Sequence, residues 1–236
     1  MSLTTAAWLV LAMPLAGTLV IALGGRVWSP KVAGWIGTIA IAFAFVFAVV
    51  AFFKLQDLPA EERLATSSLW DLVNVAGVRI QLGIYVDPLS VLMALVVSGV
   101  STLIHLYSVG YMSSDRGYTR FFAYLNFFVF SMLLLVLCDN LLVLYVSWEL
   151  VGLSSYLLIG FWYEKGKDGI GNALAAKKAF VTNRIGDFGF LLAAMTMFWA
   201  FGSFNFHAVF ENAPAVNAAM PTVILAITLF MLVGVT

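Results

Sequence analysis

Charged residues are scarce in this chain of 236 residues: they make up 10% of it, whereas 63% of its residues are hydrophobic. A soluble domain usually carries about 25% charged residues. The shortage excludes a water-soluble globular enzyme, and the abundance of apolar residues excludes a disordered chain. The 12 basic residues are balanced by 12 acidic ones, so no basic surface indicates nucleic acid as a partner.

Cysteine and histidine are also scarce. A single cysteine, Cys138, excludes an internal disulfide and a thiolate metal cluster. The two histidines, His105 and His207, lie in different segments and give no support to a haem or a zinc site. The sequence has no glycine-rich phosphate loop either. We therefore expect no cofactor and no metal in this chain.

Long apolar runs dominate the sequence instead. A helix that crosses the hydrocarbon core of a bilayer needs about 20 apolar residues. Six runs of about this length, and a seventh that is still apolar at the last residue, predict an all-α membrane protein, a multi-pass bundle of transmembrane helices. The expected spans are Ala6–Leu23, Ala33–Phe53, Pro88–Val109, Phe121–Leu137, Leu141–Phe161, Ala179–Phe201 and Pro221–Thr236.

The connection between the second and third spans is rich in strand-forming residues. Its second half runs from Ser68 to Tyr85, where Val78, Ile80, Leu82 and Ile84 recur with a period of two, and Ala76-Gly77 is a plausible turn. This pattern predicts a short external β-hairpin; a simple amphipathic cover on the membrane surface is the alternative. Asp87 and Asp139 stand at helix starts, where capping explains them without any function.

The distribution of lysine and arginine predicts the orientation. Connections on the cytoplasmic side of a membrane carry an excess of basic residues. The even connections hold three, Lys54, Arg63 and Arg79, and the odd connections hold eight. We therefore expect the odd connections in the cytoplasm and the N-terminus outside. The eight are Arg26, Lys31, Arg116, Arg120, Lys165, Lys167, Lys177 and Lys178.

Three strong ions remain inside the expected spans: Glu149, Arg184 and Asp187. An ionisable group at the middle of a bilayer costs at least about 2.5 kcal/mol and usually faces a partner or water. Helical rise places the two acids within about 6 Å of the same depth. An arginine–carboxylate clip between helices would explain two ions. The third favours a proton path, because a desolvated carboxyl group without a cation of its own can take up and release a proton.

Other polar residues extend this candidate path. Lys177 precedes Arg184 by seven residues and continues its helix face toward the cytoplasm. A stripe in the third span contains His105, which either titrates in a hydrated path or belongs to ordinary helix packing through small polar residues. The stripe consists of Ser98, Ser101, Thr102, His105 and Ser108.

Three sequence runs are specific enough to indicate a family. They are GYTRFFAYLN (117–126), DNLLVLYVSWELVGLSSYLLIGFW (139–162) and KKAFVTNRIGD (177–187). With them the chain closely resembles the chain L family, the distal antiporter-like subunits of bacterial respiratory complex I, the proton-pumping NADH–quinone oxidoreductase. The resemblance extends over essentially the whole chain.

The resemblance implies roles for individual residues. Glu149 matches a proposed proton carrier, Lys178 and Arg184 match basic residues of the sixth helix, and Asp187 matches the acid of an Arg-x-Gly-Asp motif. His105 matches a histidine of the third helix. By helical angle Lys177, rather than Lys178, shares the face of Arg184, so either lysine could serve the path.

The resemblance also implies an assembly. The chain would be a translocase subunit in the cell (inner) membrane, surrounded by lipid and by the other membrane and peripheral subunits of complex I, which hold the flavin, the iron–sulfur clusters and the quinone. Two alternatives are the large subunit of a multisubunit sodium/proton antiporter and a membrane scaffold without transport.

Family members are longer and carry an inverted second repeat, a lateral helix and a lysine on the seventh helix. We therefore expect an N-terminal portion, with residues 1–236 as one transmembrane domain. Residues 1–110 would hold three spans and the hairpin, and residues 111–236 the start of the first antiporter-like repeat.

Overall fold

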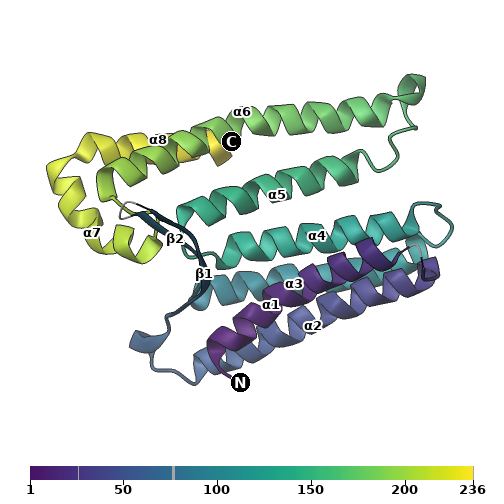
Figure 1. Cartoon of the computed structure of the whole chain (residues 1–236), viewed down its shortest axis with the longest axis horizontal. Coiled ribbons are helices and arrows are strands. Elements are labelled where there is room, and N and C mark those ends of the chain that lie inside the picture. The colour runs from purple at the N-terminus through teal and green to yellow at the C-terminus, as the bar shows by residue number, and fades with distance from the viewer. Residues whose placement is uncertain (26, 76–77, 236) are drawn as a thin grey trace.

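The computed structural model describes residues 1–25, 27–75 and 78–235, and it consists of helices and one two-stranded hairpin (Figure 1). Six of its helices are long and apolar enough to cross a membrane, and a seventh apolar helix, α8 (Pro221–Val235), is shorter. The predicted multi-pass helical fold is therefore confirmed. The six long helices are α1 (Leu3–Gly24), α2 (Pro30–Gln56), α3 (Pro88–Tyr111), α4 (Tyr118–Leu137), α5 (Leu141–Ile159) and α6 (Gly171–Phe201).

The sequence misses two features near the end of the chain. Helix α6 begins at Gly171, eight residues before the expected start of the sixth span, so Lys177 and Lys178 lie within a helix rather than in a connection. Hydropathy could not find this start, because the first two turns of α6 are too polar to count as membrane span. The second feature is α7 (Phe206–Ala219), a helix between α6 and α8.

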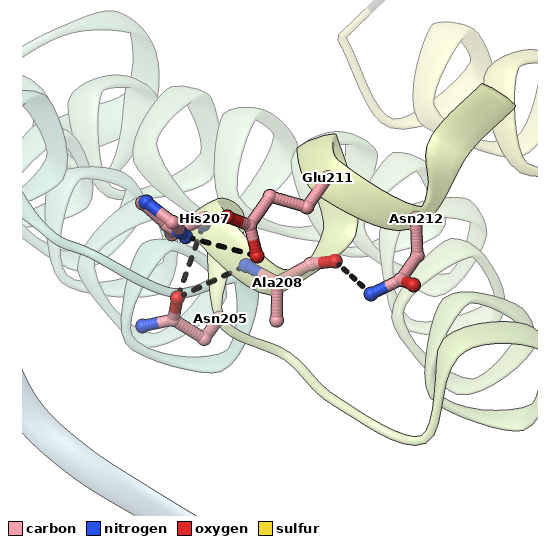
Figure 2. A network of polar contacts seen from close by, with 5 residues as sticks. All are labelled: Asn205, His207, Ala208, Glu211 and Asn212. Carbon is pink, nitrogen blue, oxygen red and sulfur yellow. Dashed lines mark hydrogen bonds and ion pairs between the residues drawn. The ribbon is translucent and has the colours of Figure 1, made fainter.

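Side-chain contacts stabilise the first turn of α7 (Figure 2). Asn205 caps it by accepting hydrogen bonds from the backbone N–H groups of His207 and Ala208. Nδ1 of His207 lies 3.4 Å from Oε2 of Glu211, one turn further on. An asparagine cap before a helix is a common start signal, so this helix was detectable by local pattern even though it is too short and too polar to span a bilayer.

The connections alternate between two ends of the molecule. The first, third and fifth connections meet at one end, where residues of all three line a common cleft; we call this the cleft end. The hairpin, the α4–α5 junction and the start of α7 meet at the other, the hairpin end, through bridges between Ile84 and Cys138 and between Asn140 and Asn205. This alternation agrees with successive membrane crossings. Arg26, one of the basic residues counted for orientation, lies outside the described residues.

The predicted hairpin is confirmed. Strand β1 (Ala65–Val75) pairs antiparallel with β2 (Val78–Val86) and follows a short 3-10 helix, η1 (Ala60–Glu62). On β2, Ile80, Ile84 and Val86 are buried, as expected from the alternation of period two. The expected turn at Ala76-Gly77 lies outside the described residues.

Small residues let α1, α2 and α4 approach closely. A Cβ atom at Gly17 would lie 2.7 Å from Oδ1 of Asn126, and one at Gly37 would lie 2.5 Å from its Nδ2. Membrane helices associate through such small residues, because lipid provides no hydrophobic drive between them. Helices α1 to α4 therefore form a close-packed bundle with a core that includes Ile41, Val129 and Leu133.

Helices α6 to α8 form a second group with α5, which packs against both α4 and α6, and Figure 1 shows α8 lying along α6. Leu141 of α5, Phe190 and Ala194 of α6, and Ile227 of α8 belong to its core. A Cβ at Gly189 would lie 3.0 Å from the backbone oxygen of Phe230, so α6 and α8 touch through their backbones. In this packing, Arg184 and Asp187 of α6 face α5.

Candidate functional site

An ion pair joins α5 to α6 within the expected membrane region. Oε1 of Glu149 lies 2.5 Å from Nη1 of Arg184. The glutamate side chain is only 16% exposed, whereas the arginine side chain is 48% exposed and also lies over the ring of Phe180. The two predicted site residues are therefore in direct contact and join α5 to α6.

Asp187 lies beside this pair but is held by a different partner. It is buried, and its Oδ1 accepts a hydrogen bond of 2.9 Å from the indole Nε1–H of Trp148. Asp187 and the hydroxyl of Tyr145 both lie close enough to interact with the Glu149 carboxyl. Two carboxyl groups thus share one guanidinium, so the site has one acid more than its cations can neutralise.

A cavity of about 280 Å³ adjoins Asp187 between α4, α5, α6 and α8. It is large enough to hold several water molecules, and water needs polar partners. The polar partners are Asp187, Asn183 and Thr182 of α6 and Ser155 of α5. Gly152 also lines the cavity, and a Cβ atom there would meet no atom within 4 Å. The arrangement can place water against the excess carboxyl group.

Sequence reasoning missed the residues of this cavity, although a signal existed for one of them. Asn183 precedes Asp187 by one helical turn, so the periodicity used for Lys177 and Arg184 would have placed it on the same face. The bond from Trp148 to Asp187 had no such signal, because it depends on how two helices are rotated against each other.

The two candidate lysines are exposed on the first turns of α6. In the described part of the chain, neither Lys177 nor Lys178 forms an ion pair. The i+7 spacing still aligns Lys177 with Arg184, and the choice between the lysines stays a prediction.

His105 belongs to the other helix group. It is fully buried, its Nδ1 lies 2.8 Å from the carbonyl oxygen of Ser101, and its Nε2 lies 3.1 Å from Nδ2 of Asn126. Both ring nitrogens therefore have partners within the α1–α4 bundle. Among the described residues no hydrogen bond joins His105 to Glu149, and the hydroxyls of Ser98 and Ser108 bond to carbonyls of α3 itself. This geometry favours packing, and a place in the proton path stays a prediction.

The two aspartates at helix starts differ. Asp87 caps α3 in a capping box with Ser90, as expected. Before α5 the cap is Asn140, whose Oδ1 accepts from the N–H of Val143. Asp139 instead accepts a hydrogen bond from Nδ2 of Asn140 and is buried, and burial raises the pKa of its carboxyl group.

The fold and these charges define a class: a multi-pass membrane chain with an ion pair and an extra acid between two spans. Two family models match it. One, described as "NADH-Ubiquinone oxidoreductase (complex I), chain 5 N-terminus", matches residues 70–122. The other, described as "NADH:quinone oxidoreductase/Mrp antiporter, TM", matches residues 138–236.

Relatives with curated names extend this similarity over nearly the whole chain. NADH-quinone oxidoreductase subunit L of Mycobacterium tuberculosis (strain ATCC 25618 / H37Rv) is 42% identical over 230 residues, which are 96% of this chain and 35% of the relative. Subunit L of Escherichia coli (strain K12) is 39% identical over 226 residues, 96% of this chain and 36% of the relative. The chain therefore spans about a third of the length of these relatives.

Two solved structures share the fold. The archaeal membrane-bound sulfane sulfur reductase has a TM-score of 0.79 at 19% identity, covering 97% of this chain and 43% of the matched one. The Mrp complex from Dietzia sp. DQ12-45-1b has a TM-score of 0.73 at 22% identity, covering 98% and 23%. The chain belongs to the family of antiporter-like membrane subunits that includes NADH-quinone oxidoreductase subunits L and 5.

Proposed function

We propose that this chain is the N-terminal part of a proton-translocating membrane subunit of an NADH–quinone oxidoreductase in the cell membrane. Residues 1–110 would form three spans with the hairpin, and residues 111–236 the start of an antiporter-like repeat. The observation that carries the proposal is the Glu149–Arg184 ion pair with Asp187 as an excess acid beside it. The subunit names of relatives that are about 40% identical support the same assembly.

The excess acid gives the site its chemistry. When Arg184 is paired with Glu149, Asp187 has no cation of its own and is stabilised by the Trp148 indole and by water in the adjoining cavity. If a cation moves away from Glu149, the buried glutamate loses its charge partner and takes up a proton. If the cation returns, the proton is released. The site therefore converts the position of a charge into uptake or release of a proton.

The polar residues of α6 would connect the site to water. Asn183 and Thr182 line the cavity beside Asp187, and Lys177 or Lys178, nearer the start of α6, would attract or repel charge on that side. The cleft end would then face the cytoplasm and the N-terminus the outside, because the connections of the cleft end are the richer in basic residues. Electron transfer, with its flavin, iron–sulfur clusters and quinone, would belong to partner subunits.

The test is Glu149→Gln in the full-length protein within its assembled complex. Glutamine keeps the size of the side chain but holds no exchangeable charge, so electron transfer should continue while protons moved per electron fall sharply. Proton uptake by sealed vesicles and quinone reduction are measured on the same preparation. Unchanged proton movement per electron would refute the proposal, and loss of the assembled complex would indicate a scaffold instead.

A second candidate is the large subunit of a multisubunit sodium/proton antiporter, which the fold shared with the Mrp complex supports. Co-purified flavin and iron–sulfur absorbance would favour the oxidoreductase. Sodium-driven proton exchange without electron transfer would favour the antiporter.

A further inference from the structure

A second and larger hollow lies at the cleft end. It has a volume of about 1050 Å³ and is formed where the α1–α2, α3–α4 and α5–α6 connections meet. Each connection contributes residues to its wall, among them Gly25, Arg116 and Lys165. It is separate from the cavity beside Asp187, and none of the residues assigned to proton transfer lines it.

Three cations line this cleft: Arg116, Arg120 and Lys165. None of them forms an ion pair with a residue that the structure describes. Arg120 donates to the carbonyl oxygen of Phe161 and lies over that ring, and Nζ of Lys165 lies 4.4 Å from the ring centre of Trp162. Aromatic rings orient the cations but do not cancel their charge.

The two acids of the cleft, Asp115 and Glu164, offset only part of the charge of these three cations. Asp115 is already engaged, because its Oδ1 accepts from the backbone N–H of Gly117 and its Oδ2 accepts from the indole N–H of Trp162. Both hydrogen bonds hold the pKa of Asp115 below its usual value. Asp115 thereby joins the third and fifth connections and shapes the wall. Glu164 is the other acid, so the lining keeps an excess of positive charge.

The floor of the cleft is apolar and continues into the membrane-spanning part of the bundle. Ile21 and Ala22 from the last turns of α1, and Ala123 from the second turn of α4, line it. Trp162 and Tyr163 also line the cleft and are exposed, and aromatic residues of this kind are enriched at a membrane–water interface. A ligand that fits has an anionic group at the helix ends and an apolar part that runs along the helices.

We propose that this cleft binds the headgroup of an anionic phospholipid. Arg116 and Lys165 would hold the phosphate oxygens, for which guanidinium and ammonium groups are suited. The backbone N–H groups of Thr119 and Arg120 would add to this, since α4 begins without a side-chain cap. The acyl chains would lie against Ile21, Ala22 and Ala123. A bound lipid would tie the three connections together at the membrane surface.

The test uses the complete membrane complex in phosphatidylcholine vesicles that contain a photoreactive phosphatidylglycerol. After illumination, labelled peptides from residues 112–124 and 160–170 are quantified by mass spectrometry. Arg116→Gln should reduce labelling about fivefold, which corresponds to about 1 kcal/mol for one basic residue near an anionic lipid. Arg116 is exposed and bonds to no described residue, so the fold should not change.

Two matched variants sharpen the result. Lys165→Gln should also reduce labelling, whereas Lys167→Gln, an exposed lysine of the neighbouring 3-10 helix η2 (Lys167–Gly169) outside the cleft, should leave it unchanged. Equal labelling by a photoreactive phosphatidylcholine would overturn the proposal. So would competition by inorganic phosphate, which would show a site for free anions, or a cleft that is cross-linked only to another protein segment.

Discussion

The two helix groups differ in how their buried polar side chains are paired. In the α1–α4 bundle, His105 bonds to Asn126 and to its own helix, and no charged side chain is buried in its described part. Between α5 and α6, two carboxyl groups compete for one guanidinium. A neutral hydrogen-bonded pair needs only one fixed geometry. Two acids with one base can instead adopt different pairings and can bind different numbers of protons. The comparison suggests a rigid frame beside a site that can change state.

The largest expected effect concerns the rigidity of the frame. A Cβ atom at Gly34 would lie only 2.1 Å from Oη of Tyr118, whose side chain is buried. Gly34→Ala should therefore destabilise the protein by up to about 3 kcal/mol, the upper range for overpacking, and lower the yield of assembled complex on native gels. Gly110→Ala is the matched control, because its Cβ would meet no atom within 4 Å. Equal yields would show that the bundle is not close-packed there.

The next effect concerns the excess acid. Asp187→Asn keeps an acceptor for the Trp148 indole but removes a proton carrier, so proton movement should slow about 100-fold if protons must pass this group. Assembly should not change. The control is Asp57→Asn, which alters an exposed acid whose contact with Lys54 is 4.0 Å long. If proton movement in Asp187→Asn equals that of the wild type, the site serves only as an ion pair that joins the two helices.

A smaller effect, on stability, distinguishes a packing role of His105 from a role in proton transfer. His105→Leu leaves the buried Nδ2 of Asn126 with one partner fewer, which should cost about 2 kcal/mol, and the thermal midpoint of the complex should fall. Adding Asn126→Leu should restore part of the loss, because both polar partners are then gone. Protons moved per electron should not change. A loss of proton movement without a loss of stability would put His105 in the path.

The smallest effect is a dependence on pH at the hairpin end. Burial raises the pKa of Asp139, so its carboxyl group binds a proton more tightly in the folded state than in the unfolded chain. The stability that this group contributes is complete below the ordinary pKa of aspartate, about 3.9, and is lost as the pH rises through the higher pKa of the folded protein. Relative to Asp139→Asn, the wild type should therefore melt at a lower temperature as the pH approaches neutrality. A constant difference between the two would contradict this.

Much of the fold could be predicted from the sequence, because length and hydropathy alone determine whether a helix can cross a bilayer. The alternation of apolar residues on β2 likewise indicated which side of the hairpin is buried, since Ile80 and Ile84 are buried and Leu82 is partly buried. The span expected from Ala179 did not give the full length of α6, because the helix begins at Gly171, in residues that are too polar to count as membrane span. Helix α7 was missed, since a short surface helix carries only a local capping signal.

The charged residues of the site were easier to find than their partners. Glu149, Arg184 and Asp187 stood out because charge is expensive in a bilayer. The sequence did not reveal which of these residues form a pair. Arg184 pairs with Glu149 of another helix rather than with Asp187, which lies three residues away on the same helix. Which of the two acids pairs with Arg184 depends on how the helices are rotated and on the hydrogen bond from the Trp148 indole. The spacing of residues in a single sequence predicts neither.

Infrared difference spectroscopy of the working complex tests the central idea that Glu149 gains and loses a proton. During turnover, the carbonyl stretch of a protonated carboxylic acid should appear in the wild type and be absent in Glu149→Gln. In Asp187→Asn the band should remain but shift, because the neighbouring charge has changed. Identical difference spectra for the wild type and Glu149→Gln would contradict the account.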